Sequence, residues 1–347
     1  MSVSPIKRLR HASRGVAGPV LVLITFLVIY AIMQPAFLSS LLITQFLNGS
    51  AVIAVAAVGE AVVIIAGGFD LSVGSALSVI NVLLAVHMGQ SNGSQIFWIV
   101  IALVVGGGIG LVNGFLIAIL RIPSIVATLA TSFFWGGVAL LILSQPGGAV
   151  SMTFSNWFTG TYAGIPNAFP LLIVTALVWL VIKRTKLGIS IYALGGDREA
   201  AIANGVKSKS TLLGAYALAG VFYGIAGLFL TAETASGDPN AGGSLLLTIF
   251  TAVVLGGVSL SGGRGDASAA IVGALILNSI FDVLYVIGIS SFYTSIFTGG
   301  VLILALITNV WGAKATERLR GLIRSATTRA NDDDTTLGGT SQEIGAR

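Results

Sequence analysis

The sequence predicts an all-α, polytopic membrane protein with about ten transmembrane helices. Of its 347 residues, 55% are hydrophobic and 9% are charged, whereas a soluble domain carries about 25% charged residues. Glycine is abundant, at 45 residues, and small residues let helices approach closely in a bilayer. The apolar residues gather in runs close to the roughly 20 residues that cross a bilayer. These observations exclude an ordinary soluble fold and a disordered chain.

The apolar runs are the expected membrane segments, and they cover residues 16–34, 42–66, 73–88, 96–120, 124–144, 168–182, 211–231, 245–258, 267–287 and 292–310. Two of them, 73–88 and 245–258, are short for a full crossing. We expect these two to be interrupted or re-entrant helices. The predicted organisation is a cytoplasmic N-terminus (1–15), a transmembrane domain (16–311) and a disordered cytoplasmic tail (312–347).

The basic residues predict the orientation in the membrane. With a cytoplasmic N-terminus and ten crossings, all 18 Lys and Arg residues fall on the cytoplasmic side, as the positive-inside rule requires. The formal charge of +5 therefore reflects topology and gives no reason to expect a nucleic-acid partner. Both chain termini are expected in the cytoplasm.

Composition also excludes several kinds of chemistry. The chain has no cysteine and two histidines, so we expect no disulfide, no thiolate or histidine metal site and no cysteine nucleophile. It contains neither Gly-x-Ser-x-Gly nor His-Glu-x-x-His, and we expect no catalytic residues. No Gly-Lys dipeptide is present, so the chain has no phosphate-binding loop of the Gly-x-x-x-x-Gly-Lys type. If ATP is used, another polypeptide binds it.

Residues 67–74 and 256–263 share Gly, Gly, Leu, Ser and Gly at equal offsets, which predicts an internal repeat. Repeated halves with interrupted helices are typical of transporters. In the first copy, Asp70 and Ser72 are placed to cap the helix that follows. The alternative is that they contact the solute directly.

Two carboxylates lie within apolar runs, at Glu60 and Asp282. An ionisable residue inside a span is a candidate functional residue because its burial is costly. An ion-coupled carrier would use such residues, whereas water-lined positions or hydrogen-bonded packing would also explain them. Glycines spaced by four, at Gly106, Gly110 and Gly114 and again at Gly220 and Gly224, predict close helix packing.

The polar segment 193–206 predicts a short exposed helix. Asp197 is a suitable N-cap, Glu199 and the alanines favour helix, and Gly205 would end it. Lysine and arginine residues flank this segment. It is suited to docking a cytoplasmic partner, and the alternative is a linker helix on anionic lipid headgroups.

This segment resembles the Glu-Ala-Ala coupling loop of bacterial ABC-importer permeases. Residues 67–74 resemble the Gly-Gly-Ile-Asp-Leu-Ser-Val-Gly signature of ribose-type sugar permeases, a family that includes the branched-chain amino-acid permeases. Residues 239–242 and 252–265 are similar to that family's Pro-Asn-Ala-Gly and Ala-Val-Val-Leu-Gly-Gly-Thr-Ser-Leu-Ser-Gly-Gly-Arg-Gly stretches. The departures at Phe69, Val258 and Asp197-Arg198 leave the sugar open.

The resemblance implies the membrane subunit of an ATP-driven importer in the bacterial inner membrane, transporting a monosaccharide or a related sugar or polyol. Its expected partners are a cytoplasmic ATPase that holds the ATP, an extracytoplasmic solute-binding protein, a second permease subunit and membrane lipid. The alternatives are a branched-chain amino-acid permease and an ion-coupled secondary carrier. The outer segments 145–167 and 232–244 are expected to receive the binding protein, although Trp157 and Tyr162 also suit an interfacial aromatic belt.

The resemblance also assigns roles to residues of this chain. The coupling loop covers about 183–210, and the residues expected to couple it to the ATPase are Gly195, Gly196, Glu199, Ala200, Ala201 and Gly205. The residues expected in the signatures or along the solute pathway are Glu60, Gly67, Gly68, Asp70, Ser72, Asn240, Gly256, Gly257, Ser259, Ser261, Arg264 and Asp282.

Overall fold

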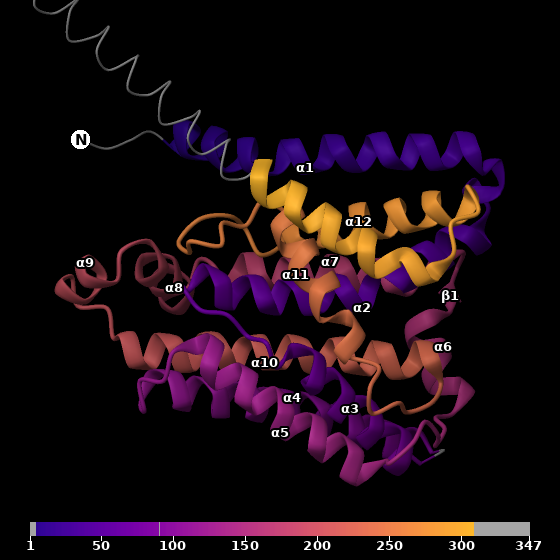
Figure 1. Ribbon diagram of the computed structural model, residues 1–347, viewed down its shortest axis with the longest axis horizontal. Coiled ribbons are helices and arrows are strands. Elements are labelled where there is room, and N and C mark those ends of the chain that lie inside the picture. Colours follow the sequence, from indigo (N-terminus) through magenta and orange to yellow (C-terminus); the bar gives the residue numbers. More distant parts are fainter. Residues whose placement is uncertain (1–4, 90, 309–347) are drawn as a thin grey trace, which may run out of the picture. The chain divides into compact units, whose positions relative to one another are not determined.

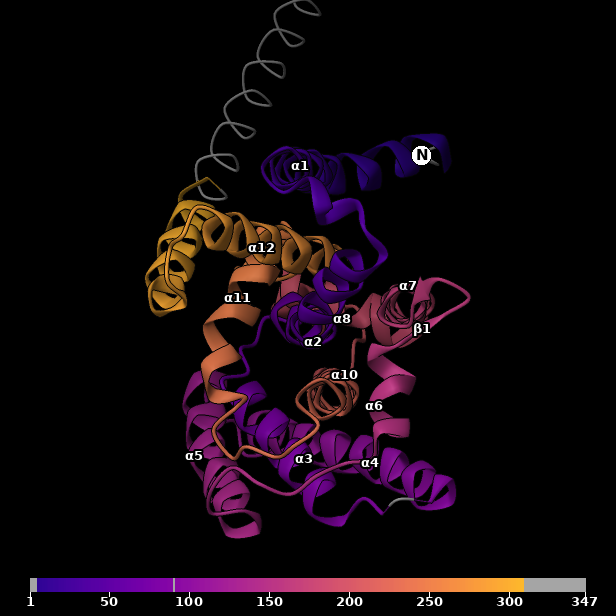
Figure 2. The ribbon, with the colours of Figure 1, turned by 90° about the vertical axis from the view of Figure 1, so that its right-hand side faces the viewer.

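A central helix, α2 (Ser40–Ile65), organises the computed structural model, which describes residues 5–89 and 91–308. Every residue of α2 from Ser50 to Ile65 is buried. This stretch is apolar on all sides, which is typical of a helix enclosed by other helices. The long helix α10 (Ser208–Thr234) packs against it, and the view along the helices in Figure 2 has this pair in the middle of the bundle.

The remaining elements surround this pair (Figure 1). They are α1 (Pro5–Met33), η1 (Pro35–Leu38), α3 (Val73–His87), α4 (Asn92–Ala118), α5 (Ser124–Ile142), α6 (Met152–Thr159), β1 (Thr161–Tyr162), β2 (Ile165–Pro166), α7 (Ala168–Ile182), α8 (Lys186–Gly196), α9 (Arg198–Ala203), η2 (Gly243–Leu245), α11 (Leu246–Leu255), α12 (Ala269–Val286) and η3 (Ser291–Tyr293). A further helix covers Thr294–Thr308. Strands β1 and β2 form one small antiparallel hairpin. The chain divides into compact units at 1–302 and 303–347, and the second is described only as far as Thr308.

Each of the ten apolar runs contains a helix, which confirms the predicted polytopic all-α membrane protein. Within the part of the chain that the structure describes, five helices are long and apolar enough to cross a membrane, and α7 with α8 makes a sixth candidate that is bent by 78°. Helices α3 and α11 are short, as expected. The count of ten crossings stays a prediction. Helix α1 begins at Pro5, within the stretch assigned to the N-terminal extension. The tail predicted over 312–347 lies outside the described residues.

The glycines spaced by four bring α4 and α10 together. A β-carbon added to Gly224 of α10 would lie 2.9 Å from the carbonyl oxygen of Ala102. One added to Gly106 of α4 would lie 2.9 Å from the nitrogen of Gly224. Real β-carbons do not approach other atoms this closely, so glycine is required for the two backbones to touch. The predicted packing role of these glycines is confirmed.

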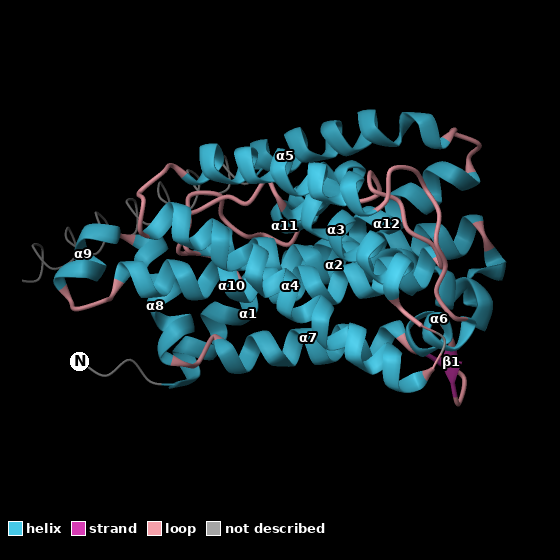
Figure 3. Cartoon of the chain, turned by 90° about the horizontal axis from the view of Figure 1, so that it is seen from below, coloured by secondary structure: helices cyan, strands magenta, loops and turns pink. Residues whose placement is uncertain are grey.

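The loops collect at two opposite ends of the bundle. The predicted outer segments meet at one end, where Gly147 and Gly237 form a backbone bridge. The β1–β2 hairpin lies at this end and α9 at the other (Figures 1 and 3). Loops that the basic residues assign to one side of the membrane therefore lie together. Which end faces the cytoplasm stays a prediction.

The two repeat motifs end their helices in the same way. At the end of α2, the N–H of Gly67 donates to the carbonyl oxygen of Ile64, and at the end of α11 the N–H of Gly257 donates to that of Val254. Gly67 has a φ of +84° and Gly257 a φ of +81°, a left-handed conformation that glycine adopts freely. In the structure, Gly67 therefore corresponds to Gly257. The sequence repeat instead aligned Gly67 with Gly256, so the two alignments differ by one residue.

Candidate functional site

The end of the bundle that carries α9 is held together by four glycines, Gly67, Gly195, Gly262 and Gly263, which we call the glycine junction. The N–H of Gly263 donates to the carbonyl oxygen of Ile65 at the end of α2, across 2.9 Å. A β-carbon on Gly195 would overlap that oxygen and lie 2.8 Å from the nitrogen of Gly263. One on Gly262 would lie 2.8 Å from the carbonyl oxygen of Gly195 and 3.1 Å from the Cα of Gly67. Three segments far apart in sequence therefore touch through their backbones.

Helix α9 follows the junction directly and has the predicted caps. The carboxylate of Asp197 accepts a hydrogen bond from the N–H of Ala200, across 3.0 Å. Beyond the last turn, Gly205 has a φ of +85°, and its N–H donates to the carbonyl oxygen of Ile202. The sequence thus specifies both ends of this six-residue helix.

The side chains of α9 are largely available to a partner. Glu199 and Ala200 are exposed, and Ile202 is 49% exposed. Ala201 is the buried residue of the helix, and it anchors α9 to the rest of the bundle. Gly196, at the end of α8, is exposed and has space for a β-carbon. Of the predicted coupling residues, Gly196, Glu199 and Ala200 are therefore exposed, whereas Ala201 is packed against the bundle.

Two predicted site carboxylates, Glu60 of α2 and Asp70, lie fully buried in contact with each other. One oxygen of Glu60 accepts the backbone N–H of Asp70 across 3.1 Å, and the other accepts the hydroxyl of Tyr223 across 2.9 Å. Among the described residues, no Lys or Arg forms an ion pair with either carboxylate. Glu60 therefore attaches the loop after α2 to α10 through hydrogen bonds.

Asp70 continues this network toward α4 and α5. Its carboxylate accepts both the N–H and the hydroxyl of Ser72, across 2.9 and 2.6 Å. Asn113 donates to the hydroxyl oxygen of Ser72 across 2.7 Å, and Thr131 donates to the side-chain oxygen of Asn113. The prediction that the side chain of Ser72 caps α3 is wrong: Ser72 occupies the N-cap position, but its hydroxyl is held by Asp70 and Asn113 and makes no capping bond.

The second signature forms a tight turn between α11 and α12. Gly256 packs against the first turn of α12, where a β-carbon would meet backbone atoms. After Gly257, the chain folds back so that the N–H of Ser259 donates to the carbonyl oxygen of Arg264 across 3.2 Å. The side chains of Ser261 and Arg264 are exposed. The glycines of this signature thus allow the tight turn of the backbone, and the side chains of Ser261 and Arg264 form part of the polar surface.

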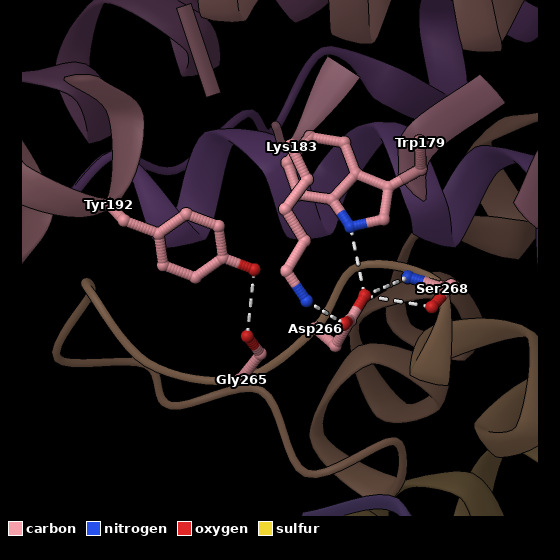
Figure 4. Close-up of polar contacts among 6 residues, drawn as sticks. All are labelled: Trp179, Lys183, Tyr192, Gly265, Asp266 and Ser268. Atoms are coloured by element: carbon pink, nitrogen blue, oxygen red, sulfur yellow. Dashed lines mark hydrogen bonds and ion pairs between the residues drawn. The ribbon is translucent and has the colours of Figure 1, made fainter. Parts of the chain in front are cut away.

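Asp266, immediately beyond this signature, is the centre of a cluster of hydrogen bonds (Figure 4). One of its oxygens accepts the indole N–H of Trp179 across 2.9 Å and the N–H and hydroxyl of Ser268 across 3.1 and 2.8 Å. The other forms an ion pair with Lys183. Trp179 is fully buried. Asp266 thereby ties the loop before α12 to α7 and to the α7–α8 connection.

A second bond strengthens this attachment. The hydroxyl of Tyr192 on α8 donates to the carbonyl oxygen of Gly265 across 2.9 Å, as Figure 4 also shows. Burial by itself raises the pKa of Asp266, but hydrogen bonds from Lys183 and Ser268 and the charge of Lys183 outweigh it. The pKa of Asp266 therefore lies below its usual value of 3.8. We call these residues, Trp179, Lys183, Tyr192, Gly265, Asp266 and Ser268, the Asp266 clamp.

A cavity of about 560 Å³ opens beside the glycine junction. Its lining includes Gly67, Ser124, Ser261 and two arginines, Arg121 and Arg198. Neither arginine side chain forms an ion pair or a hydrogen bond within the described part of the chain. The cavity therefore combines apolar side chains with two positively charged arginines, and it lies directly beside the start of α9.

The segment containing Asn240 is attached to α3 away from the glycine junction. Asn81 of α3 is fully buried; its side-chain oxygen accepts the N–H of Asp238 across 2.7 Å, and its amide donates to the carbonyl oxygen of Ser236. Asn240 itself is exposed, and its N–H donates to the carboxylate of Asp238. Asn81 therefore positions the loop that carries the predicted residue.

Asp282 lies apart from the other candidates. It is half-buried on α12, near Tyr30 of α1, and has no hydrogen bond or ion pair with any described residue. No group of three His, Asp or Glu side chains within residues 5–89 and 91–308 could hold a metal ion.

Sequence reasoning missed Asp266, Asn113 and Asn81. Asp266 follows a signature directly, and the two asparagines could have been found as polar side chains inside the apolar runs 73–88 and 96–120.

Comparison with known proteins agrees with this arrangement. The model of the family described as "Branched-chain amino acid transport system / permease component" matches residues 42–306. The chain is 34% identical over 294 residues to a ribose import permease protein of Bacillus subtilis, covering 84% of this chain and 91% of the relative. It is 32% identical over 309 residues to a galactose/methyl galactoside import permease protein of Salmonella typhimurium, covering 83% and 92% of the two chains. It is also 29% identical over 292 residues to a D-allose transport system permease protein of Escherichia coli, covering 83% and 90%. No solved structure matches the chain significantly.

The matched region includes all three signatures, the glycine junction and α9. The chain itself carries the membrane part of a transport system, and the family's ATP is used by a partner subunit. The chain belongs to the family of branched-chain amino-acid transport system permease components, the membrane subunits of ATP-binding-cassette importers.

Proposed function

We propose that the chain forms the pathway through which an importer brings a monosaccharide, or a related sugar or polyol, into the cell. The observation that carries this proposal is the set of relatives named as ribose, galactose or methyl galactoside and allose permeases, which extend over more than four-fifths of the chain. A branched-chain amino acid is the alternative solute, because the family description names that class.

The proposal includes an ATPase that docks on α9. The exposed Glu199 and Ile202 supply a charged and an apolar contact on a capped helix that stands clear of the bundle. A short rigid helix of this kind can transmit ATPase movement as a lever. A second permease subunit, either identical or a sister chain, completes the pathway, and lipid surrounds the pair.

The opposite end of the bundle would receive the solute-binding protein. Its exposed residues include Tyr162 at 83% exposure and Trp157 at 40%. Aromatic side chains are enriched in interface contacts, although the same residues would suit a membrane-interface belt. This assignment places both chain termini and α9 in the cytoplasm, in agreement with the distribution of basic residues.

The test of the solute is transport by the reconstituted system. The permease, its ATPase and its binding protein are placed in proteoliposomes, and uptake is measured for a panel of labelled sugars, polyols and branched-chain amino acids. The proposal expects ATP-dependent accumulation of a sugar or polyol. Accumulation of leucine, isoleucine or valine, with no sugar or polyol transported, would overturn it in favour of the amino-acid alternative.

The test of the docking helix is a Glu199→Lys variant in the same vesicles. Reversing this exposed charge should abolish uptake and weaken ATPase co-purification while leaving the amount of folded permease unchanged, because the Glu199 side chain forms no ion pair or hydrogen bond with any described residue. Full uptake together with unchanged ATPase association would refute the coupling role of α9.

A further inference from the structure

Movement of α9 must reach the helices that enclose the solute, and α9 is too short to extend into the bundle itself. It is the last part of an arm that comprises α7, α8 and α9. Within this arm, α7 and α8 meet at an angle of 78° across a three-residue break. A bent arm transmits movement only if it is fixed to another element near its bend.

The arm is fixed to the loop between α11 and α12 at two points. One is the glycine junction, where Gly195 at the end of α8 touches Gly262 and Gly263. The other is the Asp266 clamp at the bend, where Trp179 and Lys183 come from the α7 side and Tyr192 from the α8 side (Figure 4). Two separated attachments prevent the loop from pivoting about either one.

The two attachments differ in chemistry. The glycine junction is a contact between backbones, and the hydrogen bond from Gly263 within it joins the loop to Ile65 of α2. The clamp is charge-assisted, and hydrogen bonds to a charged group are about twice as strong as neutral ones. Its carboxylate is 18% exposed and the Lys183 side chain 31% exposed. The pair is therefore only partly screened by water.

We propose that Asp266 is a positioning residue that fastens the signature loop to the arm carrying α9, so that ATPase-driven movement of α9 is passed to α11 and α12. This inference rests on the proposed function. Asp266 need not touch the solute or the ATPase. Without the clamp, the arm still binds the ATPase through α9, but its movement is only partly transmitted to the loop. The expected consequence is ATP hydrolysis that continues while transport falls.

The test compares ATP hydrolysis with sugar uptake in proteoliposomes that contain the permease, ATPase and binding protein. Asp266→Asn removes the charge with little change of shape. Because Asp266→Asn removes a charge-assisted attachment, it should lower the number of sugar molecules transported per ATP by at least about tenfold. The matched control is Asp332→Asn in the polar tail, which is expected to leave this ratio unchanged.

Three further variants separate positioning from a general loss of stability. Lys183→Arg keeps a cation and should retain the wild-type ratio, whereas Lys183→Met should lower it, with Lys314→Met in the tail as its control. Trp179→Phe keeps an aromatic ring at this buried position but removes the indole N–H together with part of the ring system. This variant should lower the number of sugar molecules transported per ATP less than Asp266→Asn does. It can be measured in place of Asp266→Asn if that variant does not fold.

The outcomes distinguish this inference from the proposed function. If the wild-type system takes up no sugar under ATP, the proposed function fails. If the wild type transports, and Asp266→Asn or Trp179→Phe lowers uptake and ATP hydrolysis in proportion, the positioning role is overturned, because a purely structural residue changes only the amount of active complex. If Asp266→Asn takes up sugar at the wild-type rate and transports the wild-type number of sugar molecules per ATP, the positioning role is overturned as well.

Discussion

The glycine junction makes a sharp prediction about two adjacent residues, Gly195 and Gly196. A β-carbon on Gly195 would overlap the carbonyl oxygen of Ile65 and lie 2.8 Å from the nitrogen of Gly263. These atoms are backbone and belong to one hydrogen bond, so neither can rotate away. A β-carbon on Gly196 meets nothing within 4 Å, and its φ lies outside the left-handed region. Gly195→Ala should destabilise the protein, and Gly196→Ala should not.

The magnitude follows from two contributions. Forcing an extra carbon into a packed site costs about 1–3 kcal/mol, and losing the hydrogen bond from Gly263 to Ile65 adds roughly 1 kcal/mol. The sum is about 2–4 kcal/mol, or a fall in the unfolding midpoint on the order of 3–6 °C for a chain of 347 residues. Gly196→Ala lies at the end of α8, where alanine favours helix, and should leave the midpoint unchanged or raise it slightly.

The assay is thermal unfolding of the purified permease in detergent, followed by intrinsic tryptophan fluorescence for both variants and the wild type under one protocol. Equal midpoints for Gly195→Ala and Gly196→Ala would refute the backbone contact at Gly195. A lower midpoint for Gly196→Ala than for Gly195→Ala would refute the assignment of which glycine packs against α2.

Two further predictions concern the buried carboxylate network and the Asp266 clamp. Tyr223→Phe leaves one oxygen of the fully buried Glu60 without its hydrogen-bond donor, which should lower the free energy of unfolding by about 1–3 kcal/mol. The control is Tyr285→Phe, at a 79% exposed position. Equal unfolding midpoints for the two variants would contradict the network. The pKa of Asp266 is lower in the folded state than its usual 3.8, so the stability it contributes is complete above the usual value and is lost as the pH falls through the folded value. The midpoint difference between wild type and Asp266→Asn should therefore be larger at pH 7 than at pH 3, and a difference that grows on acidification would contradict this sign.

Local patterns predicted the parts of this protein that depend on neighbouring residues. The caps of α9 at Asp197 and Gly205 were predictable because a capping residue and its hydrogen-bond partner lie within four residues of each other. The packing of α4 on α10 was predictable because glycines spaced by four form a smooth helix face. The apolar runs predicted where the helices lie, since the thickness of a bilayer limits their length.

The parts that depend on distant residues were not predictable from local patterns. Asp266 acquires its role from Trp179 and Lys183, which precede it by more than 80 residues. The hydroxyl of Ser72 binds Asp70 and Asn113 instead of capping α3, because the fold brings α4 against this loop. The sequence placed Gly195 in the coupling loop and Gly263 in the repeat motif, but only the fold shows why each must be glycine: Gly195 touches Ile65 of α2, and Gly263 touches Gly196 of α8. Helix α8 also lies in a segment for which one short helix was expected.

The central claim is that this chain transports its solute only when an ATPase drives it. The most direct measurement is solute accumulation in proteoliposomes under two driving forces: ATP with ATPase and binding protein present, and an imposed proton or sodium gradient with this chain alone. We expect accumulation in the first case and none in the second, because Glu60 is fully engaged in packing hydrogen bonds and Asp282 lies apart from it. Accumulation by the chain alone on an ion gradient, without ATP, would contradict an ATP-driven mechanism.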